Sequence, residues 1–319
     1  MINIKFFPYK IGSESIKNLI SEFNTMPEYA GNVAKYKDTS PFTTRLQNHG
    51  YRPFNEKNVF IKWGNAILRT PPEVHSNLLT FNCHTPLKQF INKKTFFENF
   101  SSYERLLPKF LSTPEEINHY QLSFPANTAR PIIVERHILD GHSGVGIRLL
   151  GVNDEPDFVN GKLWVAYIPK EREFRVHFFK TGVKSFNLLI AEKLLRKADE
   201  ASVVPNRYQI RNHHNGWIYA TEHNNPIPHK VHRQAKRFAS LSNLDFGAID
   251  LIYNKTKDEA RVLEVNTAPG ITRRTTTWYA QNFITAINNH QWDTNSTKFF
   301  NGVVSLVEAN ADDLIPNEI

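Results

Sequence analysis

The fold is decided by two apolar stretches late in the chain, Phe246–Tyr253 (FGAIDLIY) and Val262–Ile271 (VLEVNTAPGI). Both are typical of strands, and the polar residues between them are typical of a turn. If the strands pair in antiparallel fashion, Asp250 comes from one strand, while Glu264 and Asn266 come from the other. Glu264 and Asn266 are two residues apart and therefore point to the same face. The pattern predicts that three oxygen-bearing side chains meet on one face of a sheet.

Three such oxygen ligands suit magnesium, a hard cation that takes few carboxylates and completes its shell with water and substrate phosphates. The alternative is that the acids are solvated strand residues. Both carboxylates lie inside apolar strand runs, where an unpaired buried charge would be costly. This argument favours the metal, with Asp250, Glu264 and Asn266 as its ligands.

A glycine-rich turn follows the expected strand at 131–136. Its backbone N–H groups can reach phosphate oxygens without a side-chain clash, and Arg136 at the end of the strand can pair with a phosphate. Glycine-rich turns are common, and the lysine–hydroxyl pair of a Walker loop is missing. The residues of the turn with this expected role are Gly141, Ser143, Gly144 and Gly146.

A third segment combines an apolar strand, 163–168, with alternating charges after it. The strand runs into Pro169 and can present backbone groups to an adenine between apolar walls. Glu173 and Arg175 share a face, so that the acid can bind ribose hydroxyls and the guanidinium can stabilise developing negative charge. The alternative for this pair is an ion pair that faces solvent.

The bulk composition is that of a globular protein of two or three lobes, with 319 residues and 40% hydrophobic residues. The net charge of +8 indicates either a nucleic-acid surface or an enzyme whose substrates carry phosphate. No Lys/Arg run is as long as a basic tail, which favours the enzyme. Cys83 is the single cysteine, so no internal disulfide is expected. Since neither a signal peptide nor a membrane span is evident, we expect a cytoplasmic protein.

Local periodicity predicts an α+β protein with an N-terminal α/β domain at 1–90, a central subdomain at 91–170 and a C-terminal subdomain at 171–319. Residues 27–57 read as irregular. Strands are expected at 2–6, 59–64, 131–136, 163–168, 173–179, 246–253 and 260–265. Helices are expected at 13–26, 93–100, after Thr113, at 228–243 and at 276–289. The segment 185–200 is expected to form either a helix or a basic loop.

These segments, in this order, resemble the ATP-grasp superfamily. The stretch Leu263–Ile271 is similar to the metal-binding strand of D-alanine–D-alanine ligases and of ribosomal-protein glutamate ligases. The whole pattern is most similar to ATP-grasp ligases encoded by tailed bacteriophages, which would place the protein in a host cytoplasm. The resemblance covers residues 90–285 and implies two α+β subdomains that sandwich ATP, after an N-terminal α/β domain.

The resemblance also implies roles for individual residues. Asp250, Glu264 and Asn266 would bind Mg²⁺. Lys93 matches the lysine that opens the central domain in the family, and Lys94 is an equal candidate for that position. The residues implied to bind ATP are Lys93, Arg136, Gly141, Ser143, Gly144, Gly146, Ala166, Tyr167, Ile168, Glu173, Lys193, Arg196, Arg211 and Asn212.

Two positions depart from the family pattern. Arg136 stands where a lysine is usual, and arginine is a bulkier, forked cation. Ala248 stands where D-alanine ligases carry an arginine, which argues against that activity. Oxyanion stabilisation then falls to Arg175, Arg273 or Arg274, of which we take Arg175 and Arg273 as the catalytic candidates.

The function implied by the resemblance is ATP-dependent ligation of a carboxylate to an amine through an acyl phosphate. The partners would be small-molecule or peptide carboxylates and amines, with nucleic acid as a less favoured partner and no membrane. Two alternatives stay open, a kinase with the same fold that phosphorylates a small molecule and a binding module without catalysis. The sequence identifies neither the substrates nor the oligomeric state.

Overall fold

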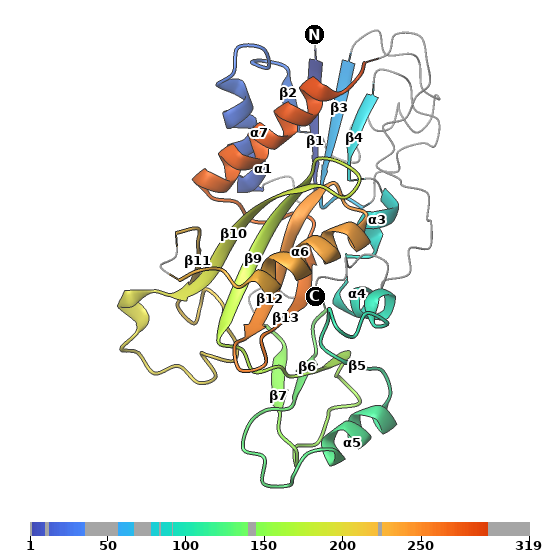
Figure 1. Cartoon of the computed structure of the whole chain (residues 1–319), viewed down its shortest axis with the longest axis vertical. Helices are drawn as coiled ribbons and strands as arrows, with labels where there is room; N and C mark the ends of the chain where they lie inside the picture. Colours follow the sequence, from blue (N-terminus) through green and yellow to red (C-terminus); the bar gives the residue numbers. More distant parts are fainter. Residues whose placement is uncertain are drawn as a thin grey trace, which may run out of the picture.

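The computed structural model describes residues 2–9, 13–35, 57–66, 78–82, 84–90, 92–139, 145–222 and 225–292. Within these ranges the chain forms three layers along its long axis, each built on its own β-sheet (Figure 1). This α+β architecture confirms the predicted fold class. No helix in the described ranges is long and apolar enough to cross a membrane.

The N-terminal layer is a parallel sheet in the order β2-β1-β3-β4. Its core joins sheet residues such as Phe6 and Ile61 to residues of both α1 and α7, for example Phe23 and Phe283. The last helix therefore returns to the first layer, where Phe6 and Phe283 meet edge to face at 6.5 Å between ring centroids. The elements are β1 (Ile2–Pro8), α1 (Glu14–Asn24), β2 (Val33–Lys35), β3 (Lys57–Trp63), β4 (Leu78–Phe81) and α7 (Arg273–Asn289).

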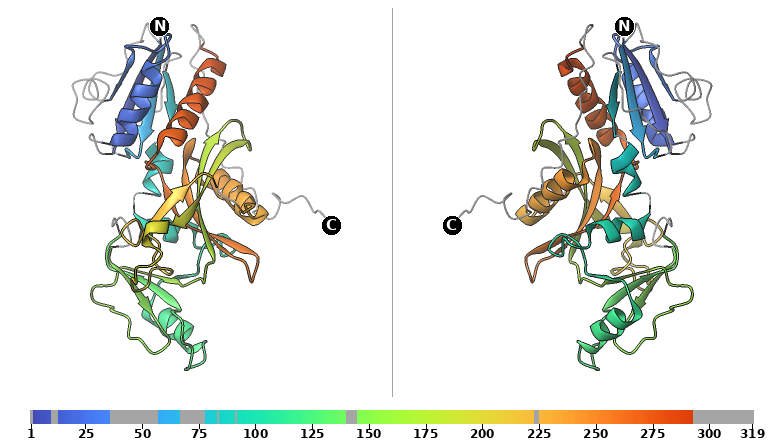
Figure 2. Two further views of the ribbon diagram at one scale, coloured as in Figure 1. Left: turned by 90° about the vertical axis from the view of Figure 1, so that its left-hand side faces the viewer. Right: turned by 90° about the vertical axis from the view of Figure 1, so that its right-hand side faces the viewer.

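The central layer is an antiparallel sheet in the order β11-β10-β9-β12-β13. Phe174, Val176 and Phe178 alternate along β9 and point into a core shared with α4 and α6. Helix α6 covers this face, and the segment between β10 and β11 lies on the other side (Figure 2). The elements are α3 (His84–Lys88), α4 (Lys93–Phe100), β9 (Arg172–Lys180), β10 (Phe186–Leu195), η1 (Lys197–Asp199), β11 (Trp217–Ala220), α6 (His229–Ser242), β12 (Phe246–Asn254) and β13 (Glu259–Asn266).

The third layer is a smaller antiparallel sheet in the order β5-β8-β6-β7. Helix α5 starts as predicted, because the Thr113 side chain accepts a hydrogen bond from the Glu116 N–H at 3.2 Å. Its Ile117 packs in a core with Ile133 and Leu150. The elements are β5 (Phe110–Leu111), α5 (Pro114–Leu122), β6 (Ile133–Arg136), β7 (Ile147–Leu150) and β8 (Leu163–Ala166).

One element differs from its prediction. The segment 185–200 was expected to be a helix or a basic loop, yet most of it forms the ten-residue strand β10 between β9 and β11. Its charged residues are neutralised from β9, since Arg172 binds the Glu192 carboxylate with two hydrogen bonds of 2.7 and 2.8 Å. Ion pairs with the neighbouring strand therefore allow this charge-rich segment to form a strand. Five short strands, β2, β4, β5, β7 and β11, were not predicted.

Candidate active site

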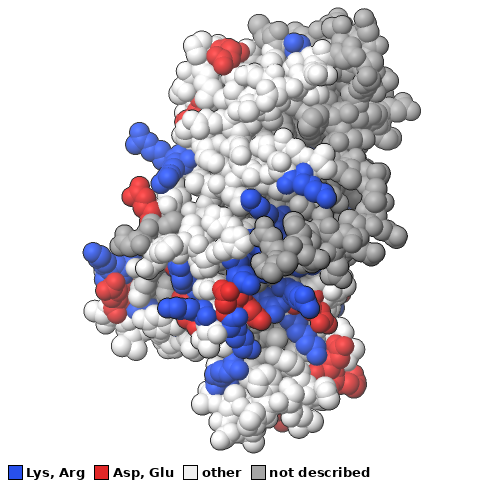
Figure 3. Space-filling view, in the orientation of Figure 1, with Lys and Arg blue, Asp and Glu red and all other residues white. Residues whose placement is uncertain are grey.

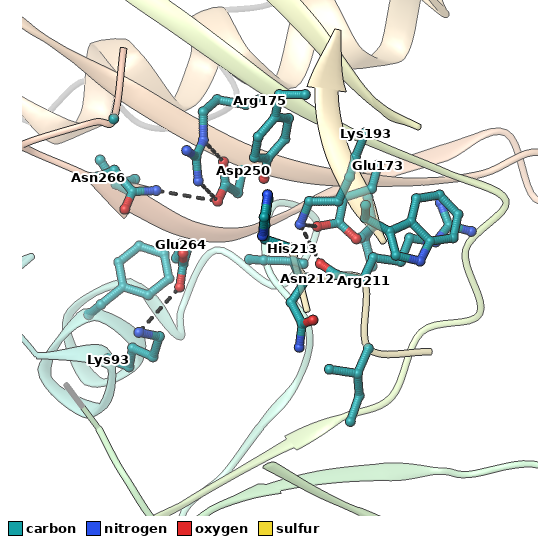
Figure 4. Close-up of a pocket in the computed structure, with 18 of the residues that line it drawn as sticks. Lys93, Glu173, Arg175, Lys193, Arg211, Asn212, His213, Asp250, Glu264 and Asn266 are labelled. Atoms are coloured by element: carbon teal, nitrogen blue, oxygen red, sulfur yellow. Dashed lines mark hydrogen bonds and ion pairs between the residues drawn. The ribbon is translucent and has the colours of Figure 1, made fainter. Parts of the chain in front are cut away.

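Strands β12 and β13 pair in antiparallel fashion, with Asp250 opposite Glu264 and Ala248 opposite Asn266, which confirms the predicted hairpin. The register shifts directly after Asp250. The Asn266 amide donates a hydrogen bond to Asp250 Oδ2 at 3.3 Å. Asp250, Glu264 and Asn266 therefore lie together on the face of the sheet away from α6 (Figure 4).

Strand β12 lies between β13 and β9, and Arg175 of β9 reaches Asp250 from the side opposite β13. Its Nε and Nη2 atoms donate to the two Asp250 oxygens, each at 2.7 Å, and its guanidinium lies over the Tyr219 ring at 4.3 Å. Burial raises the pKa of Asp250, and the charge of Arg175 opposes that rise. Burial alone would lower the pKa of Arg175, but Asp250 raises it above its ordinary value.

Glu264 faces two cations from outside the central sheet. Lys93 Nζ, at the start of α4, lies 3.4 Å from Glu264 Oε2, and Arg136 is the last residue of β6. Burial acts to raise the pKa of Glu264, but Lys93, Arg136 and Arg175 lower it to about 2. Glu264 is thus an ionised acceptor at the junction of α4, β6 and β13.

A second charged group surrounds Glu173, two residues before Arg175 on the same face of β9. Lys170 donates to one of its oxygens at 2.6 Å, and Lys193 of β10 donates to the other. Lys193 also donates to the Arg211 carbonyl at 2.7 Å. Although burial opposes ionisation, the two lysines lower the pKa of Glu173 to about 2.

Arg211 fixes the wall next to this group. Its guanidinium stacks over Trp217 at 4.5 Å and donates to the carbonyls of Lys170 and Glu171 at 3.2 and 3.0 Å. Burial lowers its pKa. The side-chain oxygen of Asn212 accepts the Asn215 N–H at 2.8 Å.

These groups line one cavity of about 1360 Å³ between the central sheet and the third layer, which the N-terminal strands close at one end. It exceeds the volume of roughly 300–1,000 Å³ that is usual for small-molecule pockets. Among the described residues its lining carries six cations, Lys93, Arg136, Lys170, Arg175, Lys193 and Arg211, and three anions, Glu173, Asp250 and Glu264. The cavity therefore suits an anionic occupant.

The structure brings most of the predicted site residues into this cavity. Besides the charged residues above, Asn212, Asn266 and the expected adenine segment Ala166–Ile168 line it. The backbone N–H groups of Ala166 and Tyr167 are already bound, to the carbonyls of Lys109 at 2.9 Å and Ile132 at 2.7 Å.

Three predicted residues do not line the cavity. Arg196 is held by Asp199 at 2.6 Å beyond the end of β10, and Arg273 is exposed at the start of α7. Gly146 has a φ of 73° and its carbonyl accepts the His137 N–H at 2.8 Å, so that it serves the turn between β6 and β7. Gly141, Ser143 and Gly144 lie outside the described residues.

The sequence analysis gave no site role to several cavity residues, among them Lys170, His177 and Tyr219. A signal existed for His177, since strand alternation places it on the face of Glu173 and Arg175. Lys170 lies three residues before its partner Glu173, a local spacing that the sequence analysis did not use. Tyr219 carries no local signal, because Arg175 and Lys193, which contact its ring, come from other strands.

The residues present fit a magnesium ion. No group of three or more His, Cys, Asp and Glu residues suited to a metal occurs in the described ranges, and the set here has two carboxylates and one amide. Mg²⁺ is usually held by one or two carboxylates, with water and phosphate oxygens as the other ligands. A carboxylate has about four acceptor sites, so Asp250 keeps capacity beyond its bonds to Arg175 and Asn266.

Comparison with solved structures identifies the fold. The chain is similar to a D-alanine–D-alanine ligase from Bacillus anthracis, with a TM-score of 0.58 and 12% identity over 90% of this chain and 98% of that one. It is also similar to the macrocyclase MdnC from Microcystis aeruginosa MRC, bound with precursor peptide MdnA, with a TM-score of 0.54 and 14% identity over 89% and 100%. A third similar structure is the ATP-grasp ligase PsnB complexed with a variant of its minimal precursor, Mg and ADP. Its TM-score is 0.55, with 11% identity over 90% of this chain and 99% of that one.

These similarities confirm the predicted resemblance to ATP-grasp ligases, and they show that the chain has the ATP-grasp fold. The resemblance to bacteriophage-encoded ligases remains a prediction. No protein-family model and no curated protein matches the sequence.

Proposed function

We propose that this protein is an ATP-dependent ligase that joins a carboxylate to an amine through an acyl phosphate. The observation that carries the proposal is the convergence of Asp250, Glu264 and Asn266 beside an excess of cations in one large cavity. Its position between two sheets of an ATP-grasp fold supports the same function.

In this proposal ATP lies between the central sheet and the third layer. The segment Ala166–Ile168 faces the adenine, and Glu173 accepts hydrogen bonds from the ribose. The cations bind the phosphates, and Lys170 joins the set expected from the sequence. The phosphate-binding residues are Lys93, Arg136, Lys170, Lys193 and Arg211.

Asp250, Glu264 and Asn266 would hold Mg²⁺, which when bound neutralises charge on phosphate oxygens. The first substrate's carboxylate oxygen attacks the γ-phosphorus and ADP leaves, which gives an acyl phosphate. A neutral amine then attacks the acyl carbon, and phosphate departs with a proton from the amine. Arg175 lies beside Asp250 and stabilises negative charge that develops at the reacting carbonyl.

Candidate substrates come from the similar solved structures. Macrocyclase MdnC and ligase PsnB were solved with precursor peptides, so peptide carboxylates and amines are candidates alongside small molecules. Nucleic acid is less favoured, because Lys and Arg on the face shown in Figure 3 are interleaved with Asp and Glu.

The test is ADP release with Mg·ATP, screened against pairs of amino acids, peptides and nucleotides, followed by mass spectrometry of the product. The proposal expects an amide product, and a hydroxamate when hydroxylamine traps the acyl phosphate. A stable phosphoester would replace the ligase with a kinase. Absence of magnesium-dependent ATP binding would leave only a binding module.

A further inference from the structure

His177 is a buried imidazole in the cavity wall for which neither ATP nor magnesium supplies a role. It is 3% exposed and follows Glu173 and Arg175 on one face of β9. Successive residues on one face of a strand are about 6.6 Å apart, so His177 lies one step beyond Arg175. The next residue on this face, Phe179, already belongs to the core of the N-terminal layer. His177 therefore stands at the far end of the charged site.

The strand register separates a charged row from a neutral one. Arg175, Asp250 and Glu264 lie side by side across β9, β12 and β13. The next row holds His177, Ala248 and Asn266, of which His177 and Asn266 line the cavity.

Beyond this row the cavity wall is uncharged in the described residues. It is lined by Pro8, Tyr9, Ser13, Trp63, Gly64, Thr267, Ala268, Gly270, Thr272 and Thr275. A second substrate that approaches from this side meets His177 before it meets the cations.

Hydrogen bonding fixes the tautomer of His177. The Tyr279 hydroxyl lies 2.8 Å from the Gly247 carbonyl, which can only accept, so the hydroxyl proton points there. His177 Nδ1 lies 3.1 Å from the same hydroxyl oxygen, so Nδ1 must carry a proton and donate it. Burial, and then the charge of Arg175, lowers the pKa of His177 to about 3, so the ring is neutral. Nε2 is therefore an unprotonated acceptor, and none of the described residues donates to it.

We propose that His177 Nε2 accepts a hydrogen bond from the attacking amine of the second substrate and orients its nitrogen toward the acyl carbon. This inference rests on the proposed ligase function. An uncharged acceptor suits the task, because a carboxylate at this place would stabilise the ammonium form, which has no lone pair for attack. The nearby Arg175 charge also disfavours an ammonium, so this end of the site selects a neutral amine.

Two substitutions test the roles of the two ring nitrogens of His177 separately. In His177→Asn the amide group replaces Nδ1 and keeps the contact with Tyr279, whereas in His177→Gln the amide oxygen reaches the position of Nε2. The assay uses the carboxylate and amine found by the ADP-release screen. Hydroxylamine is the second probe, since it attacks an acyl phosphate without an oriented amine site.

For His177→Asn we expect the KM for the amine to rise about five- to tenfold, the range for one lost hydrogen bond. Hydroxamate formation stays within about twofold of the wild type, and His177→Gln restores most of the amine affinity. An unchanged KM for the amine in His177→Asn overturns the inference. So does an equal loss of hydroxamate, which would place His177 in phosphoryl transfer. A wild type without ADP release or hydroxamate contradicts the ligase function itself, before any variant is compared.

A measurement without the natural substrates tests the same atom. In the full chain labelled with ¹⁵N-histidine, NMR should show His177 with a protonated Nδ1 and a bare Nε2, and Tyr279→Phe should weaken that preference. Methylamine added with Mg·ATP should shift the Nε2 resonance. A protonated Nε2, or no shift with methylamine, overturns the inference whatever the activity.

Discussion

Single residues of the site are held by charges that neutralise one another at short range. Arg175 binds Asp250, and two lysines bind Glu173, all with little exposed surface. Buried ions of this kind stay charged only because their partners compensate the loss of hydration. Removal of one partner therefore affects the protonation of the other as well as ligand binding.

Substitution of Glu264 by glutamine tests the metal assignment. The variant keeps the size of the side chain but loses its charge, and Glu264 is 29% exposed, so the fold should be retained. We expect magnesium-dependent ADP release to fall about a hundredfold or more, the effect of removing one group that stabilises charge in a site. Glu259→Gln, on the same strand and 42% exposed, is the matched control and should act like the wild type. Wild-type turnover in Glu264→Gln would refute the assignment.

The buried carboxyls predict a loss of stability in acid. Glu173 has an ordinary pKa of 4.5 that falls to about 2 in the folded protein. Its contribution is complete above about pH 4.5 and is lost as the pH falls toward 2, because the unfolded chain then binds more protons. For this group the free energy of unfolding should decrease by about 2 kcal/mol between pH 6 and pH 3, a decrease that urea titrations can measure. Glu173→Gln should flatten the slope, and an equal slope in both proteins would contradict the prediction.

Elements are joined by a few polar contacts between segments distant in the sequence. After β4, the Asn82 side chain accepts the N–H groups of Asp245 and Phe246 at 2.8 and 3.3 Å and donates to the Phe246 carbonyl at 3.0 Å. Asn82 is fully buried, with a φ of 58°. It therefore fastens the N-terminal sheet to the start of β12, the strand that carries Asp250.

Two substitutions of Asn82 separate its hydrogen bonds from its backbone conformation. Asn82→Gly keeps the positive φ but loses three side-chain hydrogen bonds, so we expect about 2–3 kcal/mol lower stability. Asn82→Ala should lose about 1 kcal/mol more, because a Cβ disfavours this conformation. Urea unfolding measures both, and an alanine variant more stable than the glycine variant would contradict the argument.

At the scale of the whole molecule, the cavity is walled by more than one layer. Its lining comes from the N-terminal strands, the central sheet and the third sheet. A ligand that contacts all of them binds only the folded chain and so stabilises their arrangement. Nucleotide and magnesium should act together, because in the proposed site the phosphates would lie next to Asp250, Glu264 and Asn266.

Mg·ATP should raise the unfolding temperature of the full chain. At a ligand concentration of about a hundred times Kd, the stabilisation is about 2.7 kcal/mol. ATP with EDTA should give a much smaller shift, and Asp250→Asn should lose the dependence on magnesium. Calorimetry or a dye-based thermal scan makes the measurement. A shift that is equal with and without magnesium would argue against the metal site.

Features that depend on local periodicity could be predicted from the amino-acid sequence alone. The β12–β13 hairpin, helix α4 and strand β6 with Arg136 at its end were all predicted from residue spacing. The three oxygen side chains were also predicted to meet, because alternation along a strand is a local property. The domain boundaries at 90 and 170 remain a prediction, and α7 packs with the first layer although it lies far beyond both.

The pairing of the charges and the groups at the neutral end of the cavity became visible only in the folded chain. Arg175 and Asp250 are 75 residues apart, and the tautomer of His177 depends on Tyr279, 102 residues away. Strand β10 likewise became a strand because its charged residues found partners on β9. Such pairs depend on the register between strands, which is fixed by the packing of whole faces and not by the residues nearby in sequence.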